Sequence, residues 1–157
     1  MRIVNVDDVH FLTCIKYGLW GSNKGRFGSW LRDDLLVFAL DKTIAGMAQV
    51  SGEFTVSEER IWEKGQFPYR IPINFVYAFS PENRPLLAGE IKDAIISSWG
   101  KNYGLSILVQ RLVQVDSADR IAGAIRAHQN ELLEIQKNVN ELLRVARVKK
   151  EATNKLS

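Results

Sequence analysis

Residues 35–50 read LLVFALDKTIAGMAQV, and this stretch decides the fold class that the sequence predicts. Two apolar runs of strand length, Leu35 to Leu40 and Thr43 to Val50, flank a turn at Asp41-Lys42-Thr43. Apolar and β-branched runs that are bounded by turn-forming residues are typical of β-strands. The connection is as short as those that join neighbouring antiparallel strands. The stretch therefore predicts a β-hairpin.

Three further segments have the composition of strands: Ile3 to Val6, Tyr69 to Phe79 and Leu105 to Val115. Pro72 has no N–H for a strand ladder, so the segment from Tyr69 is expected to be an edge strand or to contain a bulge. Leu86 to Ser98 carries apolar residues at helical spacing. The predicted fold is therefore α+β, a small curved sheet or open barrel with helices at its margin.

The pattern changes from Asp116 onward, where Gly and Pro nearly vanish. Asp116-Ser117 can cap a helix, so we expect one long helix from about Ser117. Its apolar seam has heptad spacing and consists of Ile125, His128, Leu132, Ile135, Val139, Leu142 and Ala146. Two interpretations stay open, a helix folded back on its own domain and a connector or coiled coil to a partner. The chain is accordingly divided into residues 1–116 and residues 117–157.

The composition is that of one globular domain. The 157 residues are 46% hydrophobic and 25% charged, with a formal net charge of +3. This mild basic excess is compatible with a phosphate-bearing partner. No apolar run is long enough for a membrane span, and MRIVNVDD lacks the apolar region of a signal peptide. We therefore expect a cytoplasmic protein without a membrane partner.

The cysteine and histidine content argues against an enzyme. Cys14 is the single cysteine, and His10 and His128 are the only histidines, so a zinc ligand set is not expected. Cys14 and His10 are close in sequence, but no third residue suggests itself to orient them as a nucleophilic pair. We expect no catalytic residues, no metal and no cofactor.

Residues 15–26 read IKYGLWGSNKGR and contain the most informative tryptophan. Trp20 is followed by the turn formers Gly21 and Ser22 and then by Lys24 and Arg26, where a core tryptophan would have apolar neighbours. An aromatic face beside cations suits base stacking with phosphate contacts. The alternative is a partly buried loop tryptophan. In either case the turn formers predict that Trp20 lies at a loop end, half open to solvent.

The segment IKYGLWGS resembles the Ile-Lys-Tyr-x-x-Trp-x-Ser segment of YTH domains, the readers of N6-methyladenine. Both strands of the predicted hairpin also resemble a strand pair of that family. Phe67-Pro68-Tyr69-Arg70-Ile71 is similar to the Tyr-Pro-Tyr-Arg-Val segment of the related EVE domains. Both families belong to the PUA-like superfamily, which implies a small barrel with flanking helices. The resemblance spans roughly Val4 to Val115.

The resemblance also implies the walls of a base pocket. Trp20 would be the first wall, Trp62 the second and Phe67 the third. Gly21, followed by Ser22 in the same motif, matches the position whose carbonyl accepts the remaining N6 hydrogen of the methylated amine.

The resemblance also implies one polar contact of the base and one of a phosphate, and the cations after Trp20 add to the second. Asp8 matches the polar residue that meets the ring nitrogen, with Asp7 and Asn5 close enough to be confused with it. Lys101 resembles a phosphate-holding residue, and Lys24 and Arg26 are expected to join it at the pocket rim.

The predicted function is non-catalytic recognition of a methylated base, N6-methyladenine in DNA, by flipping it into an aromatic cage. By architecture the chain resembles the specificity module of McrB-type restriction proteins, which implies a motor or nuclease partner reached through the C-terminal helix. The alternatives are an RNA-binding reader of this superfamily and a helix-mediated protein-interaction module. Enclosing one methyl group is worth about 1 kcal/mol, so roughly ten- to a hundred-fold discrimination is expected.

Overall fold

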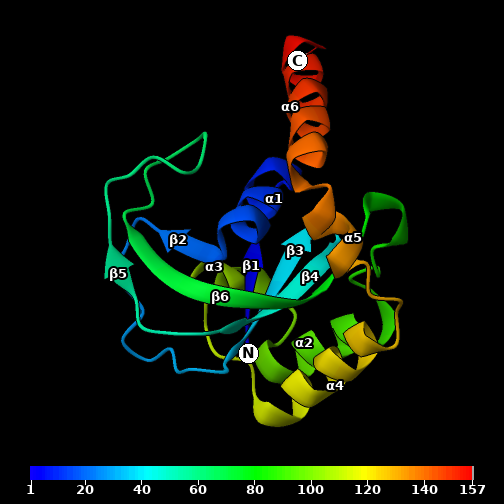
Figure 1. The fold of residues 1–157 in the computed structure, drawn as a ribbon. Coiled ribbons are helices and arrows are strands. Elements are labelled where there is room, and N and C mark those ends of the chain that lie inside the picture. The colour runs from blue at the N-terminus through cyan, green and yellow to red at the C-terminus, as the bar shows by residue number, and fades with distance from the viewer. Residues whose placement is uncertain (157) are drawn as a thin grey trace.

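A curved six-stranded sheet forms the body of the protein, which we describe from a computed structural model over residues 1–156 (Figure 1). The strand order is β1-β3-β4-β6-β2, and β5 also pairs with β6. β1 runs parallel to β3, and the other pairs are antiparallel. The strands are β1 (Arg2–Asn5), β2 (Leu19–Ser22), β3 (Leu35–Leu40), β4 (Thr43–Val50), β5 (Thr55–Val56) and β6 (Tyr69–Ala78).

The predicted hairpin is confirmed as β3 and β4. Leu40 pairs with Thr43, and the two residues between them, Asp41 and Lys42, have φ angles of 46° and 61°. Positive φ at both central residues is the geometry of the tight turns that match the twist of antiparallel strands. Both strands are buried along most of their length, because helices cover the two faces of the sheet.

The strand predicted from Tyr69 is confirmed as β6. Its pairing with β4 has the irregularity that was one of the two expectations, but at Val76, and Pro72 does not mark an edge. β6 pairs with β4 from Ala78 to Ile73 and with β2 from Pro72 to Tyr69. Pro72 therefore stands where β6 changes partner, and its carbonyl still accepts a hydrogen bond from the Ser51 N–H at 2.9 Å. The missing N–H is tolerated because the ladder with β4 ends at this point.

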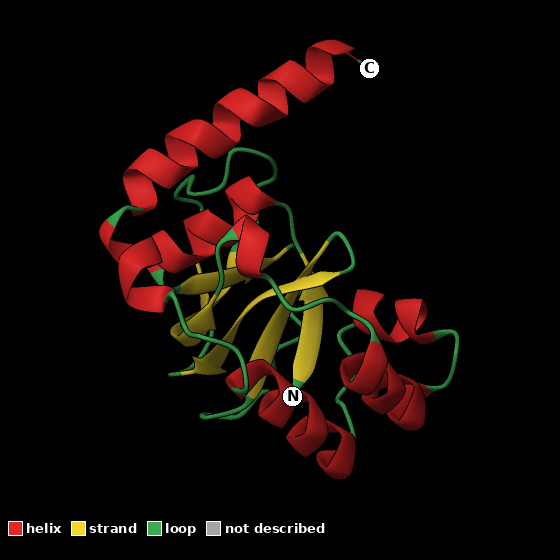
Figure 2. Ribbon diagram, turned by 90° about the vertical axis from the view of Figure 1, so that its right-hand side faces the viewer, coloured by secondary structure: helices red, strands yellow, loops and turns green. Residues whose placement is uncertain are grey.

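Helices form a layer on each face of the sheet (Figures 1 and 2). One layer contains α1, α5 and α6, and the other contains α2 and α4. The helices are α1 (Asp8–Tyr17), α2 (Gly89–Trp99), α3 (Tyr103–Leu108), α4 (Val115–Arg126), α5 (Leu132–Lys137) and α6 (Val139–Leu156), with a 3-10 turn at Pro81–Asn83. The helix predicted between Leu86 and Ser98 is confirmed as α2. No helix among the described residues is long and apolar enough to cross a membrane.

The strand predicted over Leu105 to Val115 is wrong. These residues form most of α3, the loop that leads to α4, and the first residue of α4. Leu105 and Leu108 are more than 70% exposed, and Ile107 and Val113 carry the contact with the core. The apolar composition therefore does not reflect a strand buried in the sheet.

The prediction of one helix from Ser117 is also wrong, because the chain breaks between α4 and α5. The Asn130 amide accepts a hydrogen bond from the Ala78 N–H at 3.1 Å and donates one to the Val76 carbonyl at 2.8 Å. The Glu131 carboxylate accepts hydrogen bonds from Ser80. These bonds satisfy polar groups at the end of β6, and a continuous helix would leave them without these partners.

The apolar seam of the C-terminal segment lies against the protein's own body. Leu132, Ile135 and Leu143 are buried in the same core as α1, and Val139 and Leu142 pack against it. α6 contacts α1 and reaches its N-terminal end through the ion pair of Lys150 with Asp7, and the end of α6 projects beyond the sheet (Figure 2). Of the two interpretations of this segment, the packing favours the one in which it folds back on its own domain, and the seam is not left bare for a partner. The division at residues 116 and 117 stays a prediction.

Candidate nucleic-acid interface

The site begins at the two ends of α1. The Asp7 side chain caps the helix by accepting a hydrogen bond from the His10 N–H at 2.8 Å. At the other end Gly18, with φ 63°, donates its N–H to the Cys14 carbonyl. A left-handed glycine ends a helix abruptly, so the chain enters β2 at once. This turn brings Trp20, on β2, beside His10, on the first turn of α1.

A shallow pocket of about 460 Å³, widely open to solvent, lies between the start of α1, β2 and the segment before β6. Its lining contains four of the residues that the sequence predicts for base binding: Asn5, Trp20, Gly21 and Ser22 from the N-terminal part. A fifth, Phe67, closes it from the segment before β6. The remaining lining residues are Val6, Asp7, His10, Asn23 and Gln110.

The two tryptophans do not face one another across open space, which corrects the expected cage. The His10 ring centroid lies 5.4 Å from that of Trp20 and 5.8 Å from that of Trp62, at 24° to the Trp62 plane. Phe67 closes the cluster edge-on, 5.3 Å from His10 and 5.5 Å from Trp62. The imidazole thus fills the space between the indoles, and Trp62 does not line the pocket.

Trp20 is more deeply buried than a loop end would allow. It is 6% exposed and lies inside β2, paired with Ile71. Its indole packs edge-to-face on Phe38 at 5.9 Å. The prediction of a half-open loop residue is wrong, because pairing with β6 extends the turn-rich sequence into a strand. Trp20 therefore belongs both to the core and to the pocket wall.

Gly21 allows the segment that carries Trp62 and Phe67 to pack directly on β2. A Cβ at Gly21 would lie 2.6 Å from the Trp62 ring and 2.8 Å from the Phe67 Cβ. Phe67 itself has φ 44°, a left-handed conformation that few side chains adopt, and its N–H donates to the Asn23 amide oxygen at 3.1 Å. This close fit leaves no space for a side chain at position 21.

Arg70 holds the segment that carries Trp62 and Phe67 in place, and it was not predicted as a site residue. It is 2% exposed, and its guanidinium lies over the Trp62 ring at 5.3 Å. It also donates hydrogen bonds to the carbonyls of Phe67, at 3.1 Å, and of Glu59. The Phe-Pro-Tyr-Arg-Ile segment contained this residue, but only the tertiary structure shows that it supports the second wall.

His10 was also missed as a pocket residue. Its Nε2 is buried and makes no hydrogen bond within residues 1–156. Burial lowers the pKa of His10 below its usual value, an effect that Asp7 opposes and Lys150 reinforces. The ring is therefore neutral near pH 7. The one feature of the sequence near His10 is Asp7, which marks the start of α1 and so places His10 in the first turn of that helix.

The structure brings Asn5 and Asp7 to the pocket, but not Asp8. Asp8 points to the other side of α1, where it pairs with Arg84 at 2.6 Å. Burial raises the pKa of Asp7, but hydrogen bonds from Lys150 and the His10 N–H outweigh burial and lower it overall. Asp7 is therefore an ionised acceptor at the pocket edge.

The predicted phosphate contacts do not all lie in one place. Lys24 and Arg26 are exposed on the loop after β2, directly beyond the lining residues Ser22 and Asn23. The Lys24 N–H donates to the Ser22 hydroxyl at 3.1 Å, which holds this loop at the rim. Lys101 stands between α2 and α3 and does not line the pocket.

The part of the chain that the structure describes contains no cluster of three His, Cys, Asp or Glu residues that could hold a metal. Burial raises the pKa of the Cys14 thiol to about 12, with Trp62 opposing the shift, so the thiol stays protonated. A thiol that stays protonated is a poor nucleophile. The arrangement can stack a flat ring and present hydrogen-bonding groups to it.

The curved sheet, with α1 leading directly into β2 beside the pocket, is the YTH-type fold, as comparison with solved structures confirms. The YTH domain protein Mmi1 in complex with RNA superposes with a TM-score of 0.56 at 16% identity, covering 88% of this chain and 85% of that one. The Mmi1 YTH domain gives 0.57 at 14% identity, covering 80% and 87%.

The YTH domain of Zygosaccharomyces rouxii MRB1, in complex with N6-methyladenosine RNA, gives a TM-score of 0.50 at 12% identity, covering 83% and 90%. No family model and no curated protein sequence matches this chain. At these identities the similarity is one of fold.

Proposed function

We propose that this protein is a non-enzymatic reader of a methylated nucleic-acid base, N6-methyladenine, which it holds flipped out in the pocket beside Trp20. The observation that carries the proposal is the pocket itself. It combines the aromatic residues Trp20 and Phe67 with the polar Asn5 and Asp7, a mixture typical of ligand sites. Aromatic rings from β2 and from the segment before β6 meet there with backbone and side-chain polar groups.

The chemistry of the lining fits a methylated amine. Trp20 and Phe67 offer aromatic surfaces that can enclose a methyl group, and N-methylation leaves adenine one N6 hydrogen. Gly21 presents backbone without a side chain at the same wall, so its carbonyl is our proposed acceptor for that hydrogen. Asn5 and Asp7 are the proposed partners of the ring edge, in place of Asp8.

Two observations bear on whether the nucleic acid is DNA or RNA, and they support different answers. Resemblance to microbial restriction proteins of the McrB kind supports methylated DNA, with a motor or nuclease as the downstream partner. The similar folds solved with RNA, including one with N6-methyladenosine RNA, support methylated RNA. The packing of α6 on α1 removes the bare seam on which the connector role depended, so any such partner would contact the projecting last turns of α6.

The proposal is tested with matched fluorescein-labelled RNA and DNA oligonucleotides, each carrying N6-methyladenine, 5-methylcytosine, N4-methylcytosine or no modification. Fluorescence anisotropy should show about ten- to a hundred-fold preference for N6-methyladenine over adenine in one of the two nucleic acids. Equal affinity for the three modified probes and the unmodified probe, both as RNA and as DNA, would contradict the proposal.

Charge variants test the proposed phosphate contacts of Lys24 and Arg26 separately from the aromatic residues of the pocket. The double substitution Lys24→Ala and Arg26→Ala should weaken methylated and unmethylated probes alike and flatten the dependence of affinity on salt, because phosphate contacts release counterions. Lys101→Ala tests the third proposed phosphate contact. An unchanged affinity and salt slope would remove Lys101 from the interface.

A further inference from the structure

His10 stands where a base would have to lie to contact both tryptophans. Its ring is 5.4 Å from Trp20 and 5.8 Å from Trp62, and almost parallel to the latter. Aromatic rings stack with their centroids a few ångströms apart, so a base cannot enter between the indoles while the imidazole is present. As the structure stands, an incoming base reaches Trp20 but not Trp62.

The imidazole is held in this place by packing alone. Its Nε2 is buried and forms no hydrogen bond with any residue that the structure describes. A buried polar atom without a partner costs free energy that is recovered when the atom reaches water. Rotation of the His10 side chain toward the open pocket would give Nε2 a solvent partner and would leave an aromatic slot behind it.

We propose that His10 is the gate and a specificity-determining residue of this site: its imidazole occupies the slot between Trp20 and Trp62 and leaves it when a base enters. This inference rests on the proposed function. A ligand must be flat, and it must gain enough from stacking on Trp62 and from contact with the tilted Trp20 ring to displace the imidazole. Bases that bind weakly to the outer surface of Trp20 would not open the slot, and the gate would therefore sharpen discrimination.

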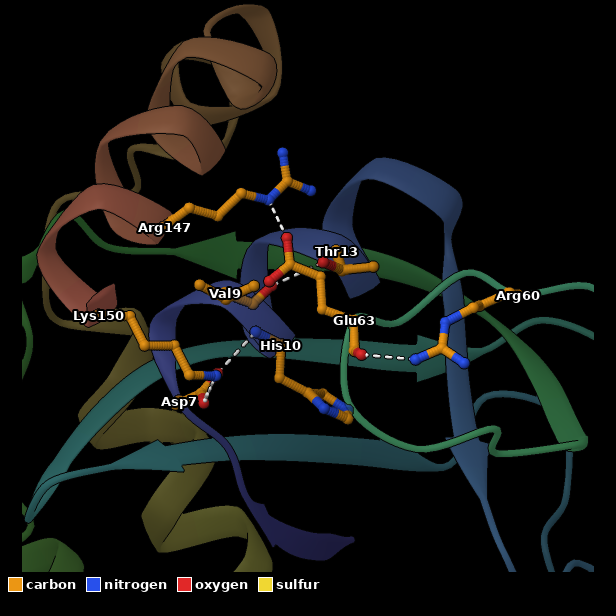
Figure 3. Close-up of polar contacts among 8 residues, drawn as sticks. All are labelled: Asp7, Val9, His10, Thr13, Arg60, Glu63, Arg147 and Lys150. Carbon is orange, nitrogen blue, oxygen red and sulfur yellow. Dashed lines mark hydrogen bonds and ion pairs between the residues drawn. The ribbon is translucent and has the colours of Figure 1, made fainter. Parts of the chain in front are cut away.

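The gate is braced from α6, as Figure 3 shows. Lys150 pairs with Asp7 at 2.8 Å, at the start of the helix that carries His10. Arg147 pairs with Glu63, next to Trp62. The His10 ring extends away from the Asp7–Lys150 pair, and its other charged neighbours in the small cavity beside Trp62 are Glu63 and Lys64.

Protonation should favour the open gate. Burial is the main factor that disfavours a charged His10 ring in the slot, and Asp7 opposes it only in part because Asp7 is paired with Lys150. Glu63 is paired with Arg147, and the Arg70 guanidinium lies over Trp62. A charged imidazolium is therefore more stable in water than in the slot. Base affinity should rise as the pH falls from 8 toward 6.

The test compares His10→Ala, His10→Phe and, as a matched control, His128→Ala, the other histidine, which packs on Phe79 away from the pocket. The probe is the labelled oligonucleotide with a single N6-methyladenine. An open minor state is typically populated at 10% or less, so His10→Ala should bind about tenfold or more tightly than the wild type and lose the pH dependence. His10→Phe should bind more weakly than the wild type, because the larger apolar ring has nothing to gain from leaving the slot, and His128→Ala should match the wild type.

The outcomes separate the gate from the proposed function. If neither the wild type nor folded His10→Ala prefers the methylated probe, the proposed function fails, and the gate fails with it. If the wild type prefers the methylated probe but His10→Ala binds equally or more weakly, the gate alone is overturned and His10 is a wall of the pocket. Should His10→Ala unfold, the wild-type pH profile decides, since affinity that is flat between pH 6 and 8 contradicts the gate.

Discussion

Gly21→Ala is the substitution for which the structure makes the sharpest prediction. The added methyl group would lie 2.6 Å from the Trp62 ring and 2.8 Å from the Phe67 Cβ, whereas carbon atoms in contact prefer about 3.5–4.0 Å. Neither neighbour can yield easily. Trp62 is 2% exposed and wedged between His10 and Arg70, and the Phe67 Cβ moves only with its backbone. The whole wall segment must therefore shift.

Overpacking of this kind typically costs about 1–3 kcal/mol of unfolding free energy. For a domain of this size each kcal/mol lowers the melting temperature by about 2–4 °C, so a decrease of roughly 2–12 °C is expected. Affinity for the methylated probe should also fall, because Trp62 and Phe67 move together. Gly28→Ala is the matched control, since no described atom lies within 4 Å of a Cβ built there.

Urea denaturation and thermal melts of both variants measure the cost, and anisotropy measures the affinity. Gly28→Ala should stay within about 0.5 kcal/mol of the wild type. A Gly21→Ala protein that is as stable as the control and that binds like the wild type would refute the packing argument, since the wall would then be loose enough to accept a methyl group.

Three further predictions concern the C-terminal segment. Asn130→Ala should lower the unfolding free energy by about 0.5–1.5 kcal/mol in urea titrations, because the part-buried Ala78 N–H and the Val76 carbonyl lose their partner; no change would show that water replaces the amide. Burial raises the pKa of Glu131, but hydrogen bonds from Ser80 and Asn83, in the turn after β6, outweigh burial and lower the pKa overall. The contact therefore stabilises the fold above about pH 4.3, and this stabilisation is lost as the pH falls through the lowered pKa. Glu131→Gln should remove that part of the pH dependence of the unfolding free energy. Arg147→Ala breaks the ion pair with Glu63, and it should lower the unfolding free energy by under about 1 kcal/mol yet speed hydrogen exchange in residues 58–67. Arg144→Ala is the control, because its partner Glu141 is on its own helix, and it should leave that exchange unchanged. Equal exchange in both variants would show that α6 does not hold the segment that carries Trp62.

The sequence by itself determined the elements that depend on neighbouring residues. The hairpin at Asp41-Lys42 follows from strand-length apolar runs around a two-residue turn, and α2 follows from helical spacing. Part of the site is local in the same sense. Trp20, Gly21 and Ser22 are consecutive in β2, and the structure places all three in the lining of the pocket.

Only the tertiary structure decided the features that depend on distant partners. The C-terminal segment breaks at Asn130 because its amide binds the end of β6, more than 50 residues earlier in the chain. Asp7 rather than Asp8 reaches the pocket, because α1 turns Asp8 toward Arg84. His10 lies between two indoles that are 42 residues apart, and no local pattern encodes that meeting. Spacing reports which face of an element is apolar, whereas the partner of that face is set by packing across the whole chain.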